Sequence, residues 1–331
     1  MSICLRRREF IAGLGGAAAV QSLGAYGQAP KLPFIGFLSI GPPRLLATYV
    51  AAFRDGMSTL GYAEGRNMAI TYRSAEGNSD QLGTLADDLV RSQVQLIVAS
   101  GGLVSARAAM KATASIPILF VSGFDPVELG MVASLNKPGG NATGVSVFST
   151  ELVPKRLELL YALGPRIQKV AVLLNPASVT PDIEAREAVA VARLKGYQLA
   201  LFEASTASGI DAAFILAAEQ QVGAFLITGS PFFSFRRAQI VALAARHAMP
   251  AMYPWREYVD DGGLMSYGTE LTWGYKIIGQ YAGRILKGQR PTELPVQQPV
   301  KFDFIINLKT AKALGLTVPP TLYALADEVI E

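Results

Sequence analysis

Short polar or aromatic turns follow several apolar segments of this chain, and their residue types suit the binding of a small molecule. The run at 117–121 predicts a buried strand, and Ser-Gly-Phe-Asp-Pro follows it directly at 122–126. In an open parallel sheet, ligands bind outside the carboxyl ends of the strands. The candidate ligand-binding residues lie in such turns or, for Phe148, just after a strand: Ser39, Ser100, Gly101, Gly102, Phe124, Asp125, Phe148, Asn175, Gly229, Phe232, Tyr253 and Trp255.

These candidates offer three kinds of contact, although ordinary turn chemistry is the alternative for any one of them. Backbone N–H groups at Gly101 and Gly102 can bind a carboxylate at the start of a helix. Asp125 can pair with an amino group, or it can simply stabilise the turn before Pro126. The side chains able to enclose an apolar or aromatic group are Phe124, Phe232, Tyr253 and Trp255.

The same survey finds no catalytic pattern. There is no Gly-rich loop that ends in Lys-Ser or Lys-Thr, and 263–268 has one residue too many before its serine to form a nucleophile elbow. His247, the single histidine, lies near the end of a predicted helix, where an imidazole complements the helix dipole. Acidic residues are scattered over helix faces. We therefore expect a protein that is not an enzyme, with no metal and no cofactor.

The amino terminus has the features of an export signal. Three arginines at 6–8 precede an apolar stretch at 11–23, which is too short to span a bilayer. Small residues at Ala25 and Gly27 predict cleavage after residue 27, and 7–11 resembles a twin-arginine core. Cleavage would remove Cys4, the only cysteine, and with it thiol chemistry. The alternative is a disordered basic tail on a cytoplasmic protein.

Composition is that of a globular protein without a nucleic-acid signature. The chain has 331 residues, of which 50% are hydrophobic and 17% are charged, so about two domains are expected. The net charge is +4, and removal of residues 1–27 takes away three arginines and one glutamate, which leaves +2. Because no Lys/Arg run is interleaved with aromatics, nucleic-acid binding is not expected.

Strand and helix patterns alternate along the whole chain with short connections. Predicted strands lie at 33–39, 68–72, 96–99, 117–121, 143–147, 169–174, 198–202, 224–227, 250–253, 263–267 and 300–306. Predicted helices lie at 43–60, 80–91, 105–113, 151–163, 183–194, 210–220, 235–247, 272–286 and 309–314, with a short helical pattern after 126. This alternation predicts mainly parallel sheets with helices on both faces. The pattern restarts near 150, so two similar halves are expected, completed by the residues from 270 onward.

Six segments together resemble one protein family, the substrate-binding proteins of ABC transporters that include the tryptophan- and tyrosine-type binding proteins. The segments are 6–11 (RRREFI), 124–130 (FDPVELG), 136–145 (NKPGGNATGV), 244–251 (AARHAMPA), 262–268 (GGLMSYG) and 306–316 (INLKTAKALGL). The resemblance implies the type I periplasmic-binding-protein fold, an α/β architecture of two doubly wound lobes joined by three crossings. It places the crossings near 148, 270 and 293. The lobes would then be 31–147 with about 270–292, and 148–269 with about 293–331.

The resemblance also implies a function and partners. The chain would capture a small organic solute in the periplasm, such as an amino acid or a carboxylate, and deliver it to a membrane permease with its ATPase. No cysteine follows the apolar stretch, so a lipid anchor is not expected, and we expect a monomer that diffuses freely. The alternatives are an exported α/β enzyme and a sensor subunit that uses the same cleft. The residues do not identify the ligand.

Overall fold

A computed structural model describes residues 32–178 and 181–331, and its strands form two sheets. The export signal predicted at 1–27 lies outside the described residues. In the first sheet all strands are parallel, in the order β2-β1-β3-β4-β5. These strands are β1 (Phe34–Ser39), β2 (Ala69–Ser74), β3 (Leu96–Ser100), β4 (Ile118–Ser122) and β5 (Ala142–Ser146).

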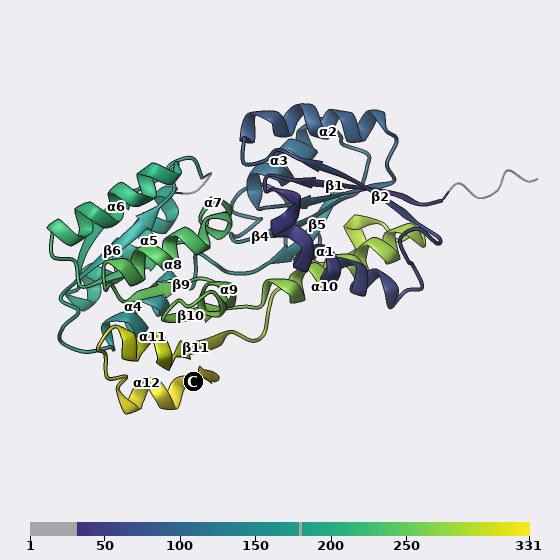
Figure 1. The fold of residues 1–331 in the computed structure, drawn as a ribbon. Coiled ribbons are helices and arrows are strands. Elements are labelled where there is room, and N and C mark those ends of the chain that lie inside the picture. Colours follow the sequence, from purple (N-terminus) through teal and green to yellow (C-terminus); the bar gives the residue numbers. More distant parts are fainter. Residues whose placement is uncertain (1–31, 179–180) are drawn as a thin grey trace, which may run out of the picture. The chain divides into compact units, whose positions relative to one another are not determined.

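Helices cover both faces of the first sheet, as Figure 1 shows. They are α1 (Pro43–Ser58), α2 (Leu82–Arg91), α3 (Leu103–Ala112) and α10 (Leu271–Leu286), with a short 3₁₀ turn, η1 (Ser79–Gln81), before α2. Alternation along β1 explains the two layers: Ile35 and Phe37 pack with α1 and α10, while Leu38 packs with α2 and α3.

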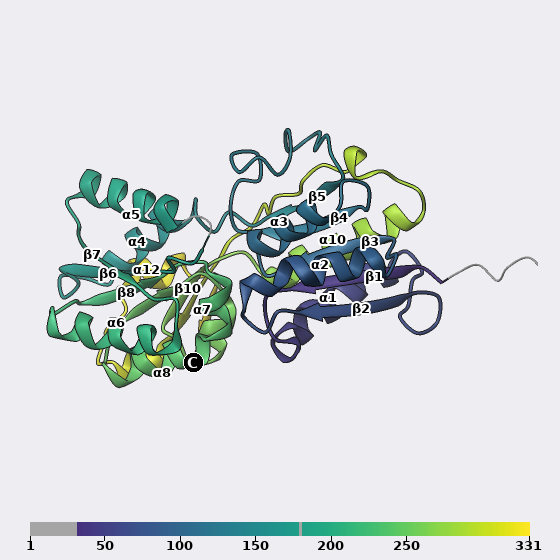
Figure 2. The same ribbon diagram turned by 90° about the horizontal axis from the view of Figure 1, so that it is seen from above.

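Two glycines let α1 and α10 approach closely, although the helices are far apart in the sequence (Figure 2). A Cβ at Gly56 would collide with the backbone carbonyl of Lys276, and one at Gly279 would collide with that of Phe53. Glycine is the only residue that fits such a crossing. The crossing matters for the site described below, because α1 and α10 each supply a tyrosine to it.

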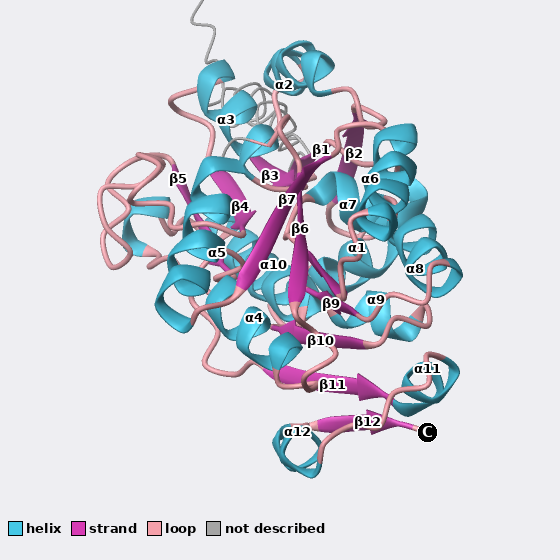
Figure 3. Ribbon diagram, turned by 90° about the vertical axis from the view of Figure 1, so that its left-hand side faces the viewer, coloured by secondary structure: helices cyan, strands magenta, loops and turns pink. Residues whose placement is uncertain are grey.

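The second sheet has the order β12-β11-β10-β9-β8-β6-β7, and Figure 3 shows it in magenta. Its strands are β6 (Lys169–Leu174), β7 (Gln198–Glu203), β8 (Ala224–Ile227), β9 (Ala251–Tyr253), β10 (Met265–Gly268), β11 (Asp303–Asn307) and β12 (Glu328–Ile330). All described pairs are parallel except β10 with β11. The expected mainly parallel sheets are therefore confirmed.

Helices also pack on both faces of the second sheet. Val170 and Val172 contact the side that carries α4, while Ala171 and Leu173 contact the side that carries α6 and α8. The helices are α4 (Val153–Tyr161), α5 (Pro181–Lys195), α6 (Ala207–Glu219), α7 (Pro231–Phe235), α8 (Arg237–Arg246), α9 (Arg256–Asp260), α11 (Leu308–Ala313) and α12 (Pro320–Leu325).

Three local expectations differ from the structure. The segment after Pro126 forms turns rather than a helix, because Gly130 has a φ of +66° and the Met131 N–H returns to the Pro126 carbonyl. The single helix expected at 235–247 is preceded by a separate helix, α7, which ends at Phe235. Helices α9 and α12 and strand β12 are additional. They are three to six residues long, so their periodicity is too short to recognise.

The last passage between the sheets comes later than residue 293. The Gln297 N–H donates to the Gly144 carbonyl at 2.9 Å, and the Ser146 N–H donates to the Gln297 carbonyl at 2.9 Å. The Thr143 hydroxyl donates to the Leu294 carbonyl at 2.6 Å. Residues 294–297 therefore run along β5, and the chain leaves the first sheet after them.

The described residues contain neither a helix that is both long and apolar enough to cross a membrane nor a cluster of metal-ligating side chains.

Candidate functional site

A cavity of about 180 Å³ lies where the strand order of both sheets changes direction. In the first sheet this point lies between β1 and β3, and in the second between β6 and β8. The loops after these four strands all contribute to the cavity wall. The lining residues are Ile40 after β1, Gly101 after β3, Asn175 after β6 and Gly229 after β8. The volume is smaller than the roughly 300–1,000 Å³ of sites for drug-sized ligands. It therefore suits a small metabolite.

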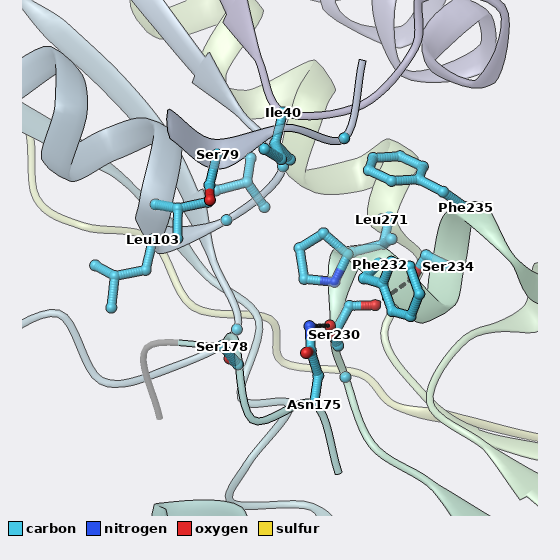
Figure 4. Close-up of a pocket in the computed structure, with 18 of the residues that line it drawn as sticks. Ile40, Ser79, Leu103, Asn175, Ser178, Ser230, Phe232, Ser234, Phe235 and Leu271 are labelled. Carbon is cyan, nitrogen blue, oxygen red and sulfur yellow. Dashed lines mark hydrogen bonds between the residues drawn. The ribbon is translucent and has the colours of Figure 1, made fainter. Parts of the chain in front are cut away.

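Seven of the twelve predicted residues line this cavity. They are Gly101, Gly102, Phe124, Asn175, Gly229, Phe232 and Trp255. Figure 4 shows Asn175, Ser230 and Phe232 on one side of the cavity, with Ile40, Ser79 and Leu103 across from them. The Asn175 side-chain amide donates to the Ser230 hydroxyl at 2.9 Å, and both side chains are buried. Whether these residues bind a ligand stays a prediction.

Three of the other five residues hold the loops rather than line the cavity. The Ser39 hydroxyl accepts from the Gly41 N–H at 3.0 Å. The Ser100 hydroxyl is 2.5 Å from the Tyr275 hydroxyl. The Asp125 carboxylate accepts from the Val127 N–H at 2.7 Å, which is the turn role that the sequence also allowed.

The remaining two predicted residues are aromatic and pack away from the cavity lining. Phe148 has a φ of +52° and contacts Phe302 edge to face, with ring centroids 6.2 Å apart. Tyr253 is fully buried and stacks on Tyr258 at 4.8 Å. Tyr253 is therefore part of the protein interior, while Phe148 is only half-buried.

Helix residues that sequence reasoning did not select supply much of the wall. Tyr49 of α1 and Tyr275 of α10 line the cavity and stack on each other, with centroids 4.8 Å apart and an interplanar angle of 13°. Phe235 of α7 and Leu271 of α10 line it as well. The helical spacing of Tyr49 predicts only a core position, and nothing in the sequence distinguishes it from its neighbours.

The cavity wall carries no acidic or basic side chain among the described residues. Its polar groups are backbone amides, the amide of Asn175 and the hydroxyls of serines and two tyrosines. Helix α3 begins here: Gly102 is its cap residue and has no side chain, and Leu103 and Val104 line the cavity too. The first N–H groups of a helix have no partner within it. They are therefore available to an anion.

A buried arginine braces the second sheet directly behind this wall. Arg156 of α4 is 0% exposed and donates to the carbonyls of Tyr267 at 2.7 Å, Ser149 at 2.7 Å and Pro254 at 3.4 Å. Its guanidinium also lies 5.9 Å from the ring of Trp255. Burial lowers the pKa of Arg156 to about 10, so it stays charged at neutral pH. One side chain thus joins strand β10 to the two loops that contain Ser149 and Pro254.

Glu184 of α5 is the second buried charged residue near the cavity. It is 0% exposed, and one carboxyl oxygen accepts from the Gly229 N–H at 3.1 Å. Burial raises the pKa of Glu184 to about 7, although the Gly229 N–H and the Arg156 charge both favour its ionised form. The carboxyl therefore titrates near neutrality.

Replacing Glu184 with glutamine is expected to flatten part of the pH dependence of stability. The ordinary pKa of this group is 4.5, and it is about 7 in the folded chain. The folded chain binds the proton more tightly, so this contribution is greatest below pH 4.5 and is lost as the pH rises through about 7. Urea unfolding at pH 5 and pH 8 measures it. When the pH rises from 5 to 8, the free energy of unfolding of Glu184→Gln should fall by about 1–3 kcal/mol less than that of the wild type. Equal losses would contradict the assignment.

The two doubly wound sheets and the cavity at their switch points define the type I periplasmic-binding-protein fold, whose two halves are called lobes below. Residues 40–330 match the ABC transporter substrate binding protein family, so the chain belongs to that family.

Known relatives agree with this assignment. The chain is 29% identical over 265 residues to a tyrosine-binding protein from Clostridioides difficile (strain R20291), which covers 80% of this chain and 75% of the relative. A conserved domain protein from Vibrio cholerae has a TM-score of 0.83 at 25% identity, covering 90% of this chain and all of the other. The ABC domain from Streptococcus pneumonia, solved in complex with L-Trp, has a TM-score of 0.82 at 24% identity, covering 91% and 100%.

Proposed function

We propose that this protein captures an aromatic amino acid, or a small carboxylate of similar shape, in the cavity between its lobes and delivers it to an ABC permease. The observation that supports this most directly is the cavity itself. Six aromatic side chains line it, while the helix start at Gly102 offers unpaired N–H groups. An aromatic ring and a carboxylate are the complementary ligand groups.

The names of the relatives point in the same direction. One is called a tyrosine-binding protein, and another was solved with L-Trp. In this chain no acidic side chain lines the cavity to pair with an ammonium group, among the residues described. We therefore propose that serine hydroxyls and backbone carbonyls receive that group.

We also propose the setting in which the protein works. Family membership and the arginine-rich start of the chain support export to the periplasm, with permease and ATPase subunits as partners and a monomer as the working form. The lobes would be 32–147 with about 270–297, and 148–269 with about 298–331. The backbone hydrogen bonds of Gln297 to Gly144 and Ser146 support placing the last crossing between the lobes after residue 297.

Isothermal titration of the purified protein tests the ligand class. L-tyrosine and L-tryptophan should bind saturably with one site per chain and a negative heat-capacity change. The deaminated acids should bind more tightly than the decarboxylated amines, because the wall offers donors to a carboxylate and no acid to an ammonium group. No binding by any of the amino acids or acids would overturn the proposed ligand class.

Replacing Phe232 with alanine should weaken binding of the aromatic ligand about 10- to 100-fold. Phe232 is half-buried in the cavity wall, and burial of an aromatic side chain against a ligand is worth roughly 1.5–3 kcal/mol. The matched control is Tyr323→Ala, which removes an aromatic ring that is 49% exposed and outside the cavity wall. If Phe232→Ala binds as well as this control does, the ligand does not contact Phe232.

A further inference from the structure

Tyr49 belongs to the cavity and also reaches across to the other lobe. Its ring is part of the wall, and its hydroxyl donates to a carboxylate oxygen of Glu257 at 3.1 Å. Tyr49 lies on α1, which packs on the first sheet, while Glu257 lies in the first turn of α9, which packs on β10 and β11. We propose that Tyr49 and Glu257 form a latch that holds the lobes together over a bound ligand.

The Tyr49 ring is held in place from its own lobe. It stacks on Tyr275, whose hydroxyl is 2.5 Å from the buried hydroxyl of Ser100 at the end of β3. Three elements of the first lobe, α1, α10 and β3, thus fix the direction in which the Tyr49 hydroxyl points. A preorganised donor loses little side-chain freedom when the bond forms.

Glu257 is equally well positioned on the other side. Trp255, two residues before it, is the cap residue of α9 and lines the cavity. One short segment therefore supplies both a wall residue and the acceptor of the bond. The pKa of Glu257 is raised, mainly because the carboxyl group is buried. The Tyr49 hydroxyl and the nearby Arg237 charge favour the ionised form of Glu257, while the Asp260 charge disfavours that form.

This arrangement links occupancy of the cavity to closure, and the link rests on the proposed function. A ligand that packs against the Tyr49 ring holds the ring where its hydroxyl meets Glu257. When the lobes separate, both groups return to water, so the bond contributes only to the closed state. Hydrogen bonds to charged acceptors are the stronger ones in proteins. The latch should therefore slow dissociation of the ligand more than it changes association.

Stopped-flow and calorimetric measurements with L-tyrosine test the latch. Tyr49→Phe keeps the stacked ring and removes the donor, so we expect affinity to fall about tenfold, mostly through faster dissociation. Glu257→Ala should do the same, and the double variant should lose no more than either single one. Glu257→Gln should retain most of the affinity, because its amide oxygen still accepts. The control is Tyr72→Phe, which removes a hydroxyl bonded to Arg54 within the first lobe.

Two results would overturn the latch: wild-type dissociation rates in Tyr49→Phe, or additive losses in the double variant. A wild-type protein that binds neither L-tyrosine nor L-tryptophan would count against the proposed function instead. The bond should also favour the closed arrangement of the lobes when no ligand is bound, so small-angle scattering of the ligand-free protein tests the latch separately. Tyr49→Phe should have a larger radius of gyration than the wild type and Tyr72→Phe, and equal radii would refute it.

Discussion

Replacing Arg156 with leucine is expected to lower the free energy of unfolding by about 3–5 kcal/mol, the cost of removing one partner from a buried charged network. Three backbone carbonyls lose their donor, and Glu184 is left without the nearby positive charge that favours its ionised form. The carbonyls of Ser149 and Pro254 belong to loops next to the cavity. Ligand binding should therefore weaken as well.

Chemical denaturation at pH 7 measures this effect. The matched control is Arg107→Leu, an exposed arginine on α3, which should change stability by less than about 0.5 kcal/mol. Adding Glu184→Leu to Arg156→Leu should recover part of the loss, because the double variant no longer buries a carboxyl group whose nearby positive charge has been removed. If Arg156→Leu and Arg107→Leu unfold at the same denaturant concentration, the brace does not exist.

The sequence contains a local signal for this brace. Arg156 lies on the apolar stripe of α4 with Val153, Leu157 and Leu160, all of which are buried. A charged residue at such a position must be buried and needs partners. The stripe predicts that the Arg156 side chain points into the core. It does not identify the three carbonyls that accept from Arg156, because they belong to residues 7 to 111 positions away in the chain.

The fold was largely predictable because it depends on local periodicity. Buried strands such as Leu96–Ser100 are short apolar runs that end at turn residues, and the alternation of these runs with helices leads to parallel sheets. The site was predictable only where loops form it. Turns after strands must gather at the carboxyl ends of a parallel sheet, which correctly places Gly101 and Asn175 at the cavity.

The cavity residues that lie on helices could not be predicted in this way. Tyr49 and Tyr275 have the spacing of core residues, and both do pack against the core of the first sheet. Their position at the cavity depends on the crossing of α1 with α10, which the small residues Gly56 and Gly279 permit. A periodic pattern shows which face of a helix is buried, but it does not show how far along that face the core ends and the cavity begins.

Replacing Gly41 with valine is expected to weaken ligand binding about 10- to 100-fold while leaving the fold intact. Gly41 follows β1, and a Cβ at this position would collide with the ring of Phe235 on α7. Its backbone does not need glycine, because its φ is not in the left-handed region. Overpacking typically costs 1–3 kcal/mol, and here the cost falls on the closed arrangement of the lobes alone.

The ring of Phe235 could relieve the collision by moving, but its surroundings oppose this. Phe235 packs against buried clusters of both lobes. Trimming the ring should therefore restore the space: Gly41→Val with Phe235→Ala should bind L-tyrosine about as well as Phe235→Ala alone. Calorimetry gives the affinities, and circular dichroism checks that each variant melts within a few degrees of the wild type. If the double variant stays as weak as Gly41→Val, the valine acts through the loop and its bond to Ser39, and the lobes do not close at this contact.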